Sequence, residues 1–317
     1  LKPGEKNTLA VRLENLPESS RWYPGAGLYR NVHLIITEDA YIPVWGTYIT
    51  TPSVNEKFAK VNVRTKVVLP EGADPAKYSV ETSVWNPNKQ KLTAVRTSLA
   101  QMKYNNNQAE QEFVIQAPSL WSPEMPALYS AETRLYEGDK LKDIYTTPFG
   151  IRSIEIIPDK GFFLNGKRTV FKGVCNHHDL GPLGAAVNDA AIRRQIRILK
   201  DMGCNAIRTS HNMPAPELIR ACDEMGMMIM AESFDEWNVA KSKNGYNLLF
   251  DEWAEKDLVN LLHNFRNNPS VVMWCIGNEV PNQWNEGDCK IAKWLQDICH
   301  REDPTRPVTQ GMDAPDA

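Results

Sequence analysis

Hydrophobic and polar residues alternate with a period of two in the first half of the chain. Clear runs lie at residues 61–67, 78–84 and 129–135, and the turn-forming segments PEGADP, NPNKQK and YNNNQ separate such runs. Short alternating strands joined by turns are typical of an antiparallel β-sandwich. The pattern predicts one complete sandwich at residues 40–149. It also predicts that residues 1–39 are the last strands of a preceding β-domain.

The pattern changes near Gly150. Apolar runs such as NAIRTSH, MMIMAES and VVMWCIGNE now alternate with segments whose apolar residues recur every three to four positions. Near-continuous apolar strands that alternate with amphipathic helices are typical of parallel βα units. Asp189 is a plausible N-cap of the first helix, and Gly203 and Gly226 are expected to end the first and second helices.

Polar residues follow each of these predicted strands, and no glycine-rich phosphate loop follows the first one. A doubly wound sheet would usually carry such a loop. In a TIM barrel, by contrast, the carboxyl ends of all strands converge on the active-site face. The sequence therefore predicts the first five strands of a TIM barrel at residues 150–317.

Composition and charge exclude several classes of function. The chain has 36 basic and 39 acidic residues and a formal net charge of −3, without a basic block. Nucleic acid is therefore not an expected partner. No apolar run reaches the roughly 18 residues that would span a membrane. The chain begins at Leu1 without a recognisable signal peptide. We interpret it as lacking its native N-terminus, so a periplasmic or extracellular location and a cytoplasmic one both stay open.

Two residues at the end of the fourth predicted strand are the strongest candidates for chemistry. Glu279 follows VVMWCIGN, and partial burial there would raise its pKa, as suits a general acid. Asn278 could donate a hydrogen bond to a sugar hydroxyl. The alternative for Glu279 is a helix-capping glutamate in an ordinary loop.

The first and second strands supply further candidates. Arg208 and His211 could bind a polar ligand or hold Glu279 in place, or could form a structural ion pair and a satisfied core histidine. His177 and His178 are poor joint metal ligands, because adjacent side chains on a strand point to opposite faces. We therefore expect His177 to contact substrate.

An acidic group follows the third strand: Glu232, Asp235 and Glu236, with Trp237 beside it. Hard cations take oxygen ligands, so a Mg²⁺ or Na⁺ site near Glu236 is one interpretation. Solvated loop charge is the other. Trp237 could offer an apolar platform to a sugar ring or simply pack in the core.

Taken together, several strings resemble glycoside hydrolase family 2: SSRWYPGAGLYRNVHL, GIRSIEI, FFLNGKRTVFKGVCNHHD, IRTSHNMPAPELIRACDEMGMMIMAESFDEW and NNPSVVMWCIGNEVP. The resemblance covers essentially the whole chain. It implies a sugar-binding jelly roll ending at residue 39, an immunoglobulin-like sandwich at 40–149 and part of a TIM barrel at 150–317, with the chain truncated at both ends.

The resemblance also implies a reaction. It implies a retaining exo-β-glycosidase, with a β-galactosidase first, in which Glu279 is the acid/base and Asn278 contacts the sugar 2-hydroxyl. His211, Arg208 and His177 would line the site. The nucleophile would be a glutamate on the seventh strand, beyond Ala317, so residues 1–317 alone are expected to be inactive.

The alternatives are a β-glucuronidase, a β-mannosidase or a non-catalytic carbohydrate-binding or scaffold protein. The expected partner is an oligosaccharide or glycoside, and the full-length enzyme could be a homo-oligomer. No organic or redox cofactor is implied. Asn238 stands where metal-binding relatives carry a histidine, which weakens the case for a cation at Glu236.

Overall fold

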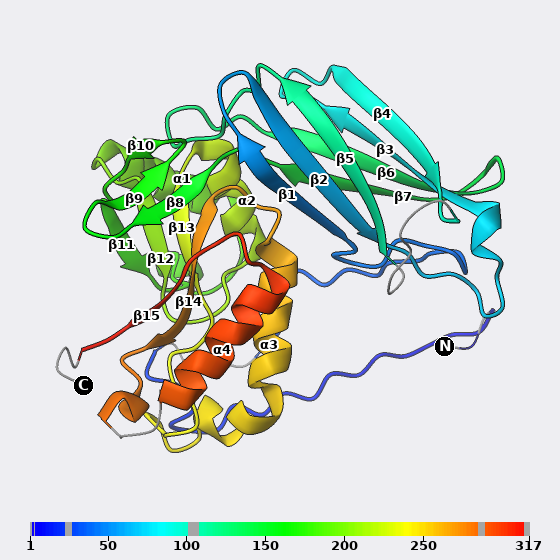
Figure 1. Ribbon diagram of the computed structural model, residues 1–317. Coiled ribbons are helices and arrows are strands. Elements are labelled where there is room, and N and C mark those ends of the chain that lie inside the picture. The colour runs from blue at the N-terminus through cyan, green and yellow to red at the C-terminus, as the bar shows by residue number, and fades with distance from the viewer. Residues whose placement is uncertain (1, 3, 23–26, 101–107, 285–288, 314–317) are drawn as a thin grey trace.

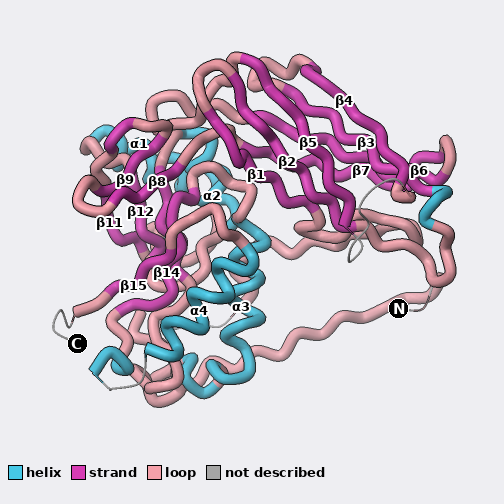
Figure 2. The backbone as a smooth tube through the Cα atoms, viewed as in Figure 1, coloured by secondary structure: helices cyan, strands magenta, loops and turns pink. Residues whose placement is uncertain are grey.

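The computed structural model describes residues 2, 4–22, 27–100, 108–284 and 289–313. An all-β layer and an α/β unit lie side by side, and a long N-terminal segment runs past both of them (Figure 1). Figure 2 separates the two groups of strands, of which only the second is flanked by α-helices.

The all-β layer is a two-sheet antiparallel sandwich. Its first sheet has the order β1-β2-β5 and its second the order β4-β3-β6-β7. Because side chains alternate between the two faces of a strand, every second side chain points into the space between the sheets. Val61, Val63 and Phe113 are buried there, while their sequence neighbours face outward. The strands are β1 (Thr47–Val54), β2 (Phe58–Lys66), β3 (Tyr78–Trp85), β4 (Lys91–Ser98), β5 (Gln108–Gln116), β6 (Tyr129–Glu137) and β7 (Lys140–Phe149), and a short 3-10 helix, η1 (Pro75–Lys77), precedes β3.

The described residues among the first 39 form no strand, contrary to prediction. They run as an extended arm whose apolar side chains stay exposed, as at Leu9, Val11, Leu34 and Ile36. A strand needs a neighbour for its backbone hydrogen bonds, and the described part of this chain offers the arm none. The arm instead attaches to loops of the α/β unit, where the backbone N–H of Asn244 donates to the carbonyl of Glu18 at 2.9 Å.

A small antiparallel sheet, which the sequence pattern did not predict, connects the two layers. Its strands are β8 (Ile154–Ile157), β9 (Gly161–Leu164) and β10 (Lys167–Arg168), in the order β10-β9-β8. Phe162 and Leu164 of β9 form a cluster with Trp121 of the sandwich and Met228 of the parallel sheet. The sheet thus covers the starting ends of the parallel strands with apolar side chains.

The α/β unit contains the predicted five parallel strands in sequential order, β11-β12-β13-β14-β15. This arrangement confirms the interpretation as part of a TIM barrel. The strands are β11 (Gly173–Asn176), β12 (Ala206–Thr209), β13 (Met228–Glu232), β14 (Val271–Asn278) and β15 (Val308–Gly311). The helices are α1 (Asp189–Asp201), α2 (Pro216–Met225), α3 (Phe250–Phe265) and α4 (Cys289–Glu302), with short 3-10 turns η2 (Gly181–Leu183), η3 (Tyr246–Leu248) and η4 (Pro281–Trp284). No helix of the described residues is long and apolar enough to cross a membrane.

Helix boundaries follow local chemistry. Asp189 is the first residue of α1, and the cap is its predecessor Asn188, whose side chain accepts from the backbone N–H of Ala191. This corrects the predicted cap by one position. Gly226 ends α2 as predicted, in the left-handed conformation at φ +73° that favours glycine.

Asp303 joins the sandwich to the α/β unit. Its carboxylate accepts from the Tyr48 hydroxyl of β1 at 2.8 Å and from the indole N–H of Trp274 in β14 at 2.9 Å. Arg306 neutralises it through an ion pair of 2.6 Å in which both side chains are almost fully buried. The same carboxylate therefore contributes to the packing of both the sandwich and the α/β unit.

Candidate active site

Glu232 is the last residue of β13 and is fully buried. One carboxylate oxygen accepts from the guanidinium of Arg208 at 2.7 Å, and the other lies 3.1 Å from Nδ1 of His211. Burial raises the pKa of Glu232, while the hydrogen bond to His211 and the charge of Arg208 act in the opposite direction. Glu232 therefore holds two of the predicted site residues in fixed orientations.

A continuous hydrogen-bond network links the ends of β12, β13 and β14. The guanidinium of Arg208 also donates to Oδ1 of Asn278 at 3.1 Å, and Nδ2 of Asn278 donates to Asp235 at 3.0 Å. A side chain at Gly311 on β15 would collide with this guanidinium, since a Cβ there would lie 2.5 Å from it. The predicted convergence of Arg208, His211 and Asn278 is therefore present in the structure.

Asp235 extends the network to the N-terminal arm. It accepts from Arg21 at 2.9 Å and from Lys241 at 3.0 Å as well as from Asn278. Burial alone would raise the pKa of Asp235, but these hydrogen bonds and the charge of Lys241 outweigh burial and lower it. Asp235 therefore stays ionised and anchors the arm across the strand ends.

Glu279 follows directly after β14 and differs from the rest of the network. It has a left-handed backbone at φ +44°, and its N–H donates to the carbonyl of Gly311 at 2.8 Å. Its side chain is exposed, so the predicted partial burial is not present here. No hydrogen bond or ion pair engages its carboxylate within the described residues. The backbone is thus fixed while the carboxylate is open to solvent.

Two histidines and a tryptophan form an aromatic wall beside the network. The centre of the Trp22 ring, in the arm, lies 4.5 Å from the centre of the His177 ring and 5.2 Å from that of His211. The two histidine rings meet edge to face at 5.2 Å. Burial and the neighbouring His211 lower the pKa of His177. The sequence alone gave no reason to place Trp22 here, because 155 or more residues separate it from both histidines.

His178 lies apart from this wall. Its ring faces Tyr29 at 6.4 Å, and it lines a separate small cavity with Arg30 and Leu180. Burial and the charge of Arg30 lower the pKa of His178 to about 4. The ring of His178 thus packs near Tyr29 and outside the aromatic wall, although His177 also lines this small cavity.

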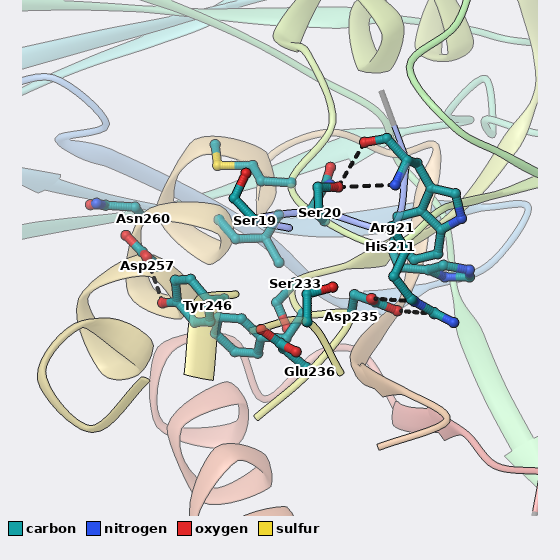
Figure 3. Close-up of a pocket in the computed structure, with 16 residues that line it drawn as sticks. Ser19, Ser20, Arg21, His211, Ser233, Asp235, Glu236, Tyr246, Asp257 and Asn260 are labelled. Atoms are coloured by element: carbon teal, nitrogen blue, oxygen red, sulfur yellow. Dashed lines mark hydrogen bonds and ion pairs between the residues drawn. The ribbon is translucent and has the colours of Figure 1, made fainter. Parts of the chain in front are cut away.

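A cavity of about 410 Å³ opens beside the network, between the arm and the loops after β12 and β13. Figure 3 shows Arg21, His211 and Asp235 at one side of it and Tyr246, Asp257 and Asn260 at the other. Glu279 does not line this cavity. The cavity thus adjoins the network at His211 and Asp235 and does not reach Glu279.

Trp237 does not offer a platform for a sugar. It is 1% exposed, its indole N–H donates to the carbonyl of Ile276 at 2.8 Å, and its ring packs on Phe250. A ring that is enclosed in this way supports the end of β14 from within. Its assignment as a substrate contact is therefore wrong for this structure.

Glu236 fixes the backbone of the loop that follows β13. It is almost fully buried, and its two oxygens accept from the backbone N–H groups of Lys241 and Asn247 at 2.6 and 3.0 Å. The described residues contain no group of three or more His, Cys, Asp or Glu side chains that could hold a metal ion. Asn238 is bonded to Asn282. These residues do not fit the Mg²⁺ or Na⁺ site considered from the sequence.

Comparison with known proteins gives a consistent result. Residues 41–152 match the family model described as glycosyl hydrolases family 2, and residues 155–316 match its TIM barrel domain. A β-galactosidase of Bacteroides ovatus, BoGH2A, is 40% identical over the whole chain. A β-glucuronidase of Bacteroides fragilis is 31% identical over 98% of the chain.

A solved structure of a family 2 glycosyl hydrolase from Bacteroides cellulosilyticus superposes with a TM-score of 0.86. It has 37% identity and covers 93% of this chain. The chain spans only 41% of the B. ovatus protein, 46% of the B. fragilis protein and 38% of that solved chain.

Proposed function

The chain belongs to glycosyl hydrolase family 2, and we propose on that basis that the protein is a retaining exo-β-glycosidase with Glu279 as its acid/base. The observation that carries the proposal is the contrast within the network. Each acidic side chain around Glu279 that the structure describes, at Glu232, Asp235 and Glu236, is bonded to the protein itself. Glu279 alone among these four presents its carboxylate to solvent.

The proposed reaction has two steps. Glu279 first protonates the glycosidic oxygen as the bond to the departing group breaks and a second carboxylate attacks the sugar. Glu279 then removes a proton from the water that hydrolyses the glycosyl-enzyme. A carboxylate on a fixed backbone, without a protein partner among the described residues, can reach first a leaving group and then water.

The neighbouring residues are proposed to hold the sugar. The network uses Oδ1 and one N–H of Asn278, which leaves its second N–H for the sugar 2-hydroxyl. His177, His211 and Trp22 together form a wall with an apolar ring face and ring nitrogens, a combination that suits a pyranose. Arg208 is proposed to act through Asn278 and Glu232 and not by direct contact.

Among substrates we favour a β-galactoside over a β-glucuronide. A uronate carboxylate would need a cation to pair with it. Near the strand ends, within the residues that the structure describes, Arg21, Arg208 and Lys241 are each paired with a protein carboxylate. The similarity to the B. ovatus β-galactosidase supports the same choice. The similarity to β-glucuronidases keeps the glucuronide as the second candidate.

A panel of nitrophenyl glycosides tests this function. We expect the intact protein to hydrolyse the β-galactoside with a kcat/KM at least 100-fold above those of the β-glucuronide and β-mannoside, and to release β-galactose first, as seen by proton NMR. A preference for the glucuronide would transfer the assignment to that sugar. Release of the α-anomer, or binding without hydrolysis of any glycoside, would reject the retaining-enzyme proposal.

A further inference from the structure

A second cavity lies at the junction between the sandwich and the helices of the α/β unit. It has a volume of about 260 Å³ and is lined from the sandwich by residues of β1 and β2 and from the other side by the last residues of α3 and α4. Figure 1 shows β1 and β2 facing these helices. The charged or titratable residues that line it are Arg64, Lys66, His263, Arg266, Arg301 and Glu302.

The lining is strongly cationic. It contains four Lys or Arg side chains and a histidine, but only one acidic side chain, Glu302. The carboxylate of Glu302 is already used, because it lies 2.7 Å from Nε2 of His263 and accepts from Nε of Arg301 at 2.8 Å. Arg301 is further paired with Glu255 at 2.9 Å. The protein's own acidic groups therefore neutralise only part of this cavity.

The uncompensated charge lies mainly on β2. Arg266, which follows α3, is partly compensated, because one of its terminal nitrogens lies 4.0 Å from the Glu302 carboxylate and donates to the Glu302 carbonyl at 3.3 Å. Neither Arg64 nor Lys66 has an ion pair with a described residue, and the guanidinium of Arg64 lies 4.7 Å from the centre of the Tyr48 ring. The guanidinium of Arg266 lies 4.4 Å from the same ring centre. Its Nε is buried and has no hydrogen-bond partner in the part of the chain that is described. Two guanidinium groups thus lie within 5 Å of the centre of the same ring.

Helix dipoles explain part of this cluster. Basic residues at the carboxyl end of a helix are stabilised by the dipole, and His263, Arg266 and Arg301 all lie in such positions. The dipole gives no reason for Arg64 and Lys66, which belong to a β-strand of the other layer. Positive charges that approach one cavity from the sandwich and from the helices repel each other, and an anion bound between them would offset this repulsion.

We propose that this cavity binds a tetrahedral oxyanion, namely sulfate or phosphate, either as a free ion or as an ester group on a saccharide. Guanidinium groups match the geometry of such oxygens through paired N–H donors, and Lys66 adds a mobile point charge. The volume is just below the range of about 300–1,000 Å³ that is typical for drug-sized ligands. It suits a ligand of monosaccharide size or smaller.

The site is distinct from the proposed catalytic centre. The carboxyl ends of α3 and α4 precede the first residues of β14 and β15, whereas Glu279 follows the last residue of β14. The eight residues of β14 span roughly 25 Å at about 3.3 Å per residue. An anion here would therefore bind at the opposite end of the parallel strands from Glu279 and would not need the proposed glycosidase activity.

Calorimetric titration of the intact protein with sodium sulfate and sodium phosphate, at ionic strength held constant with sodium chloride, tests the proposal. We expect saturable binding that the double variant Arg64→Gln/Lys66→Gln weakens at least tenfold. The matched control Lys57→Gln/Lys60→Gln removes two charges from the start of the same strand and from the residue before it, away from the cavity, and should change binding less than twofold. Both double variants should keep kcat/KM for a nitrophenyl glycoside within twofold.

Two further measurements distinguish a lost anion site from a folding defect: a variant that retains both charges and a heavier ion that can be located in crystals. Arg64→Lys/Lys66→Arg should keep binding within about threefold, and crystals soaked in selenate should show anomalous density in the cavity that Arg64, Lys66 and Arg266 line. Tighter binding of galactose 6-sulfate than of inorganic sulfate would identify the ester as the ligand, and equal binding would identify the free ion. Binding no stronger than that of chloride, equal losses in the two Gln double variants, or selenate found only elsewhere would overturn the proposal.

Discussion

The ends of β13 and β14 can be compared directly, because each apolar strand leads to a glutamate and the two strands are neighbours. Glu232 ends β13, is fully buried and is bonded to Arg208 and His211. Glu279 lies one residue beyond β14, is exposed and has no partner for its carboxylate within the described residues.

The difference comes from the neighbouring strand and from one backbone angle. Arg208 and His211 extend from the end of β12 toward Glu232, so that carboxylate is enclosed. Glu279 has a left-handed backbone conformation, so the chain leaves the direction of β14 at this residue. Similar sequence positions thus produce a structural carboxylate in one case and one available for chemistry in the other.

Replacing Glu279 with alanine in the intact protein should have the largest effect on turnover. We expect kcat/KM to fall about 10²–10⁴-fold for substrates with poor leaving groups, the usual worth of general acid help. The loss should be smaller for activated aryl glycosides, and azide should restore part of the turnover by replacing water. The folded protein should be as stable as the parent in urea, because the carboxylate is exposed. Equal losses for all leaving groups, without azide rescue, would make Glu279 a structural residue like Glu232.

Replacing Glu232 with alanine should have the opposite signature. Removing one partner of a buried ion pair costs about 3–5 kcal/mol, since Arg208 keeps its charge without a carboxylate. Urea denaturation measures this change in the free energy of unfolding. The control Glu252→Ala breaks an exposed pair with Lys256 and should cost at most about 0.5 kcal/mol. Equal free energies of unfolding for the two variants would contradict the expectation that the buried carboxylate contributes more to stability than the exposed one.

The third and smallest effect concerns pH and the neutral His178. Its pKa is about 4 in the folded protein against 6.5 in an unfolded chain, so the unfolded chain binds the extra proton first as pH falls. Folding stability should therefore be fully present above pH 6.5 and decline toward pH 4, by up to roughly 3 kcal/mol.

His178→Asn should remove most of this acid sensitivity, as followed by urea denaturation at pH 7, 5.5 and 4. His300→Asn on the exposed face of α4 serves as the control and should leave the pH dependence unchanged. The same acid-induced loss in the parent and in His178→Asn would show that other groups cause it.

Much of the α/β unit could be predicted because periodicity is a local signal. The apolar faces of α1 to α3, Gly226 as the end of α2 and the parallel strands all follow from residues that are near one another in sequence. The clustering of Arg208, His211 and Asn278 followed from a general property of parallel strands, whose carboxyl ends share one face.

The errors have a common physical cause, which is contact between distant segments. Trp237 and Glu236 lie in one short loop, and only the packing of β14 and the backbone of residues 241–247 determines that both are enclosed. Trp22 joins the site through Arg21 and Asp235, which are 214 positions apart. The arm lacks its predicted strands because pairing depends on partners and not on alternation alone.

Asp303 has a consequence for cooperativity. Its carboxylate is fully buried and shared by Tyr48 of the sandwich, Trp274 of the parallel sheet and Arg306. Melting either layer alone would withdraw a donor from a charge that has no access to water, so partial unfolding carries a penalty beyond the lost apolar contact. The sandwich and the α/β unit should consequently behave as one thermodynamic unit, with a single melting transition in place of two.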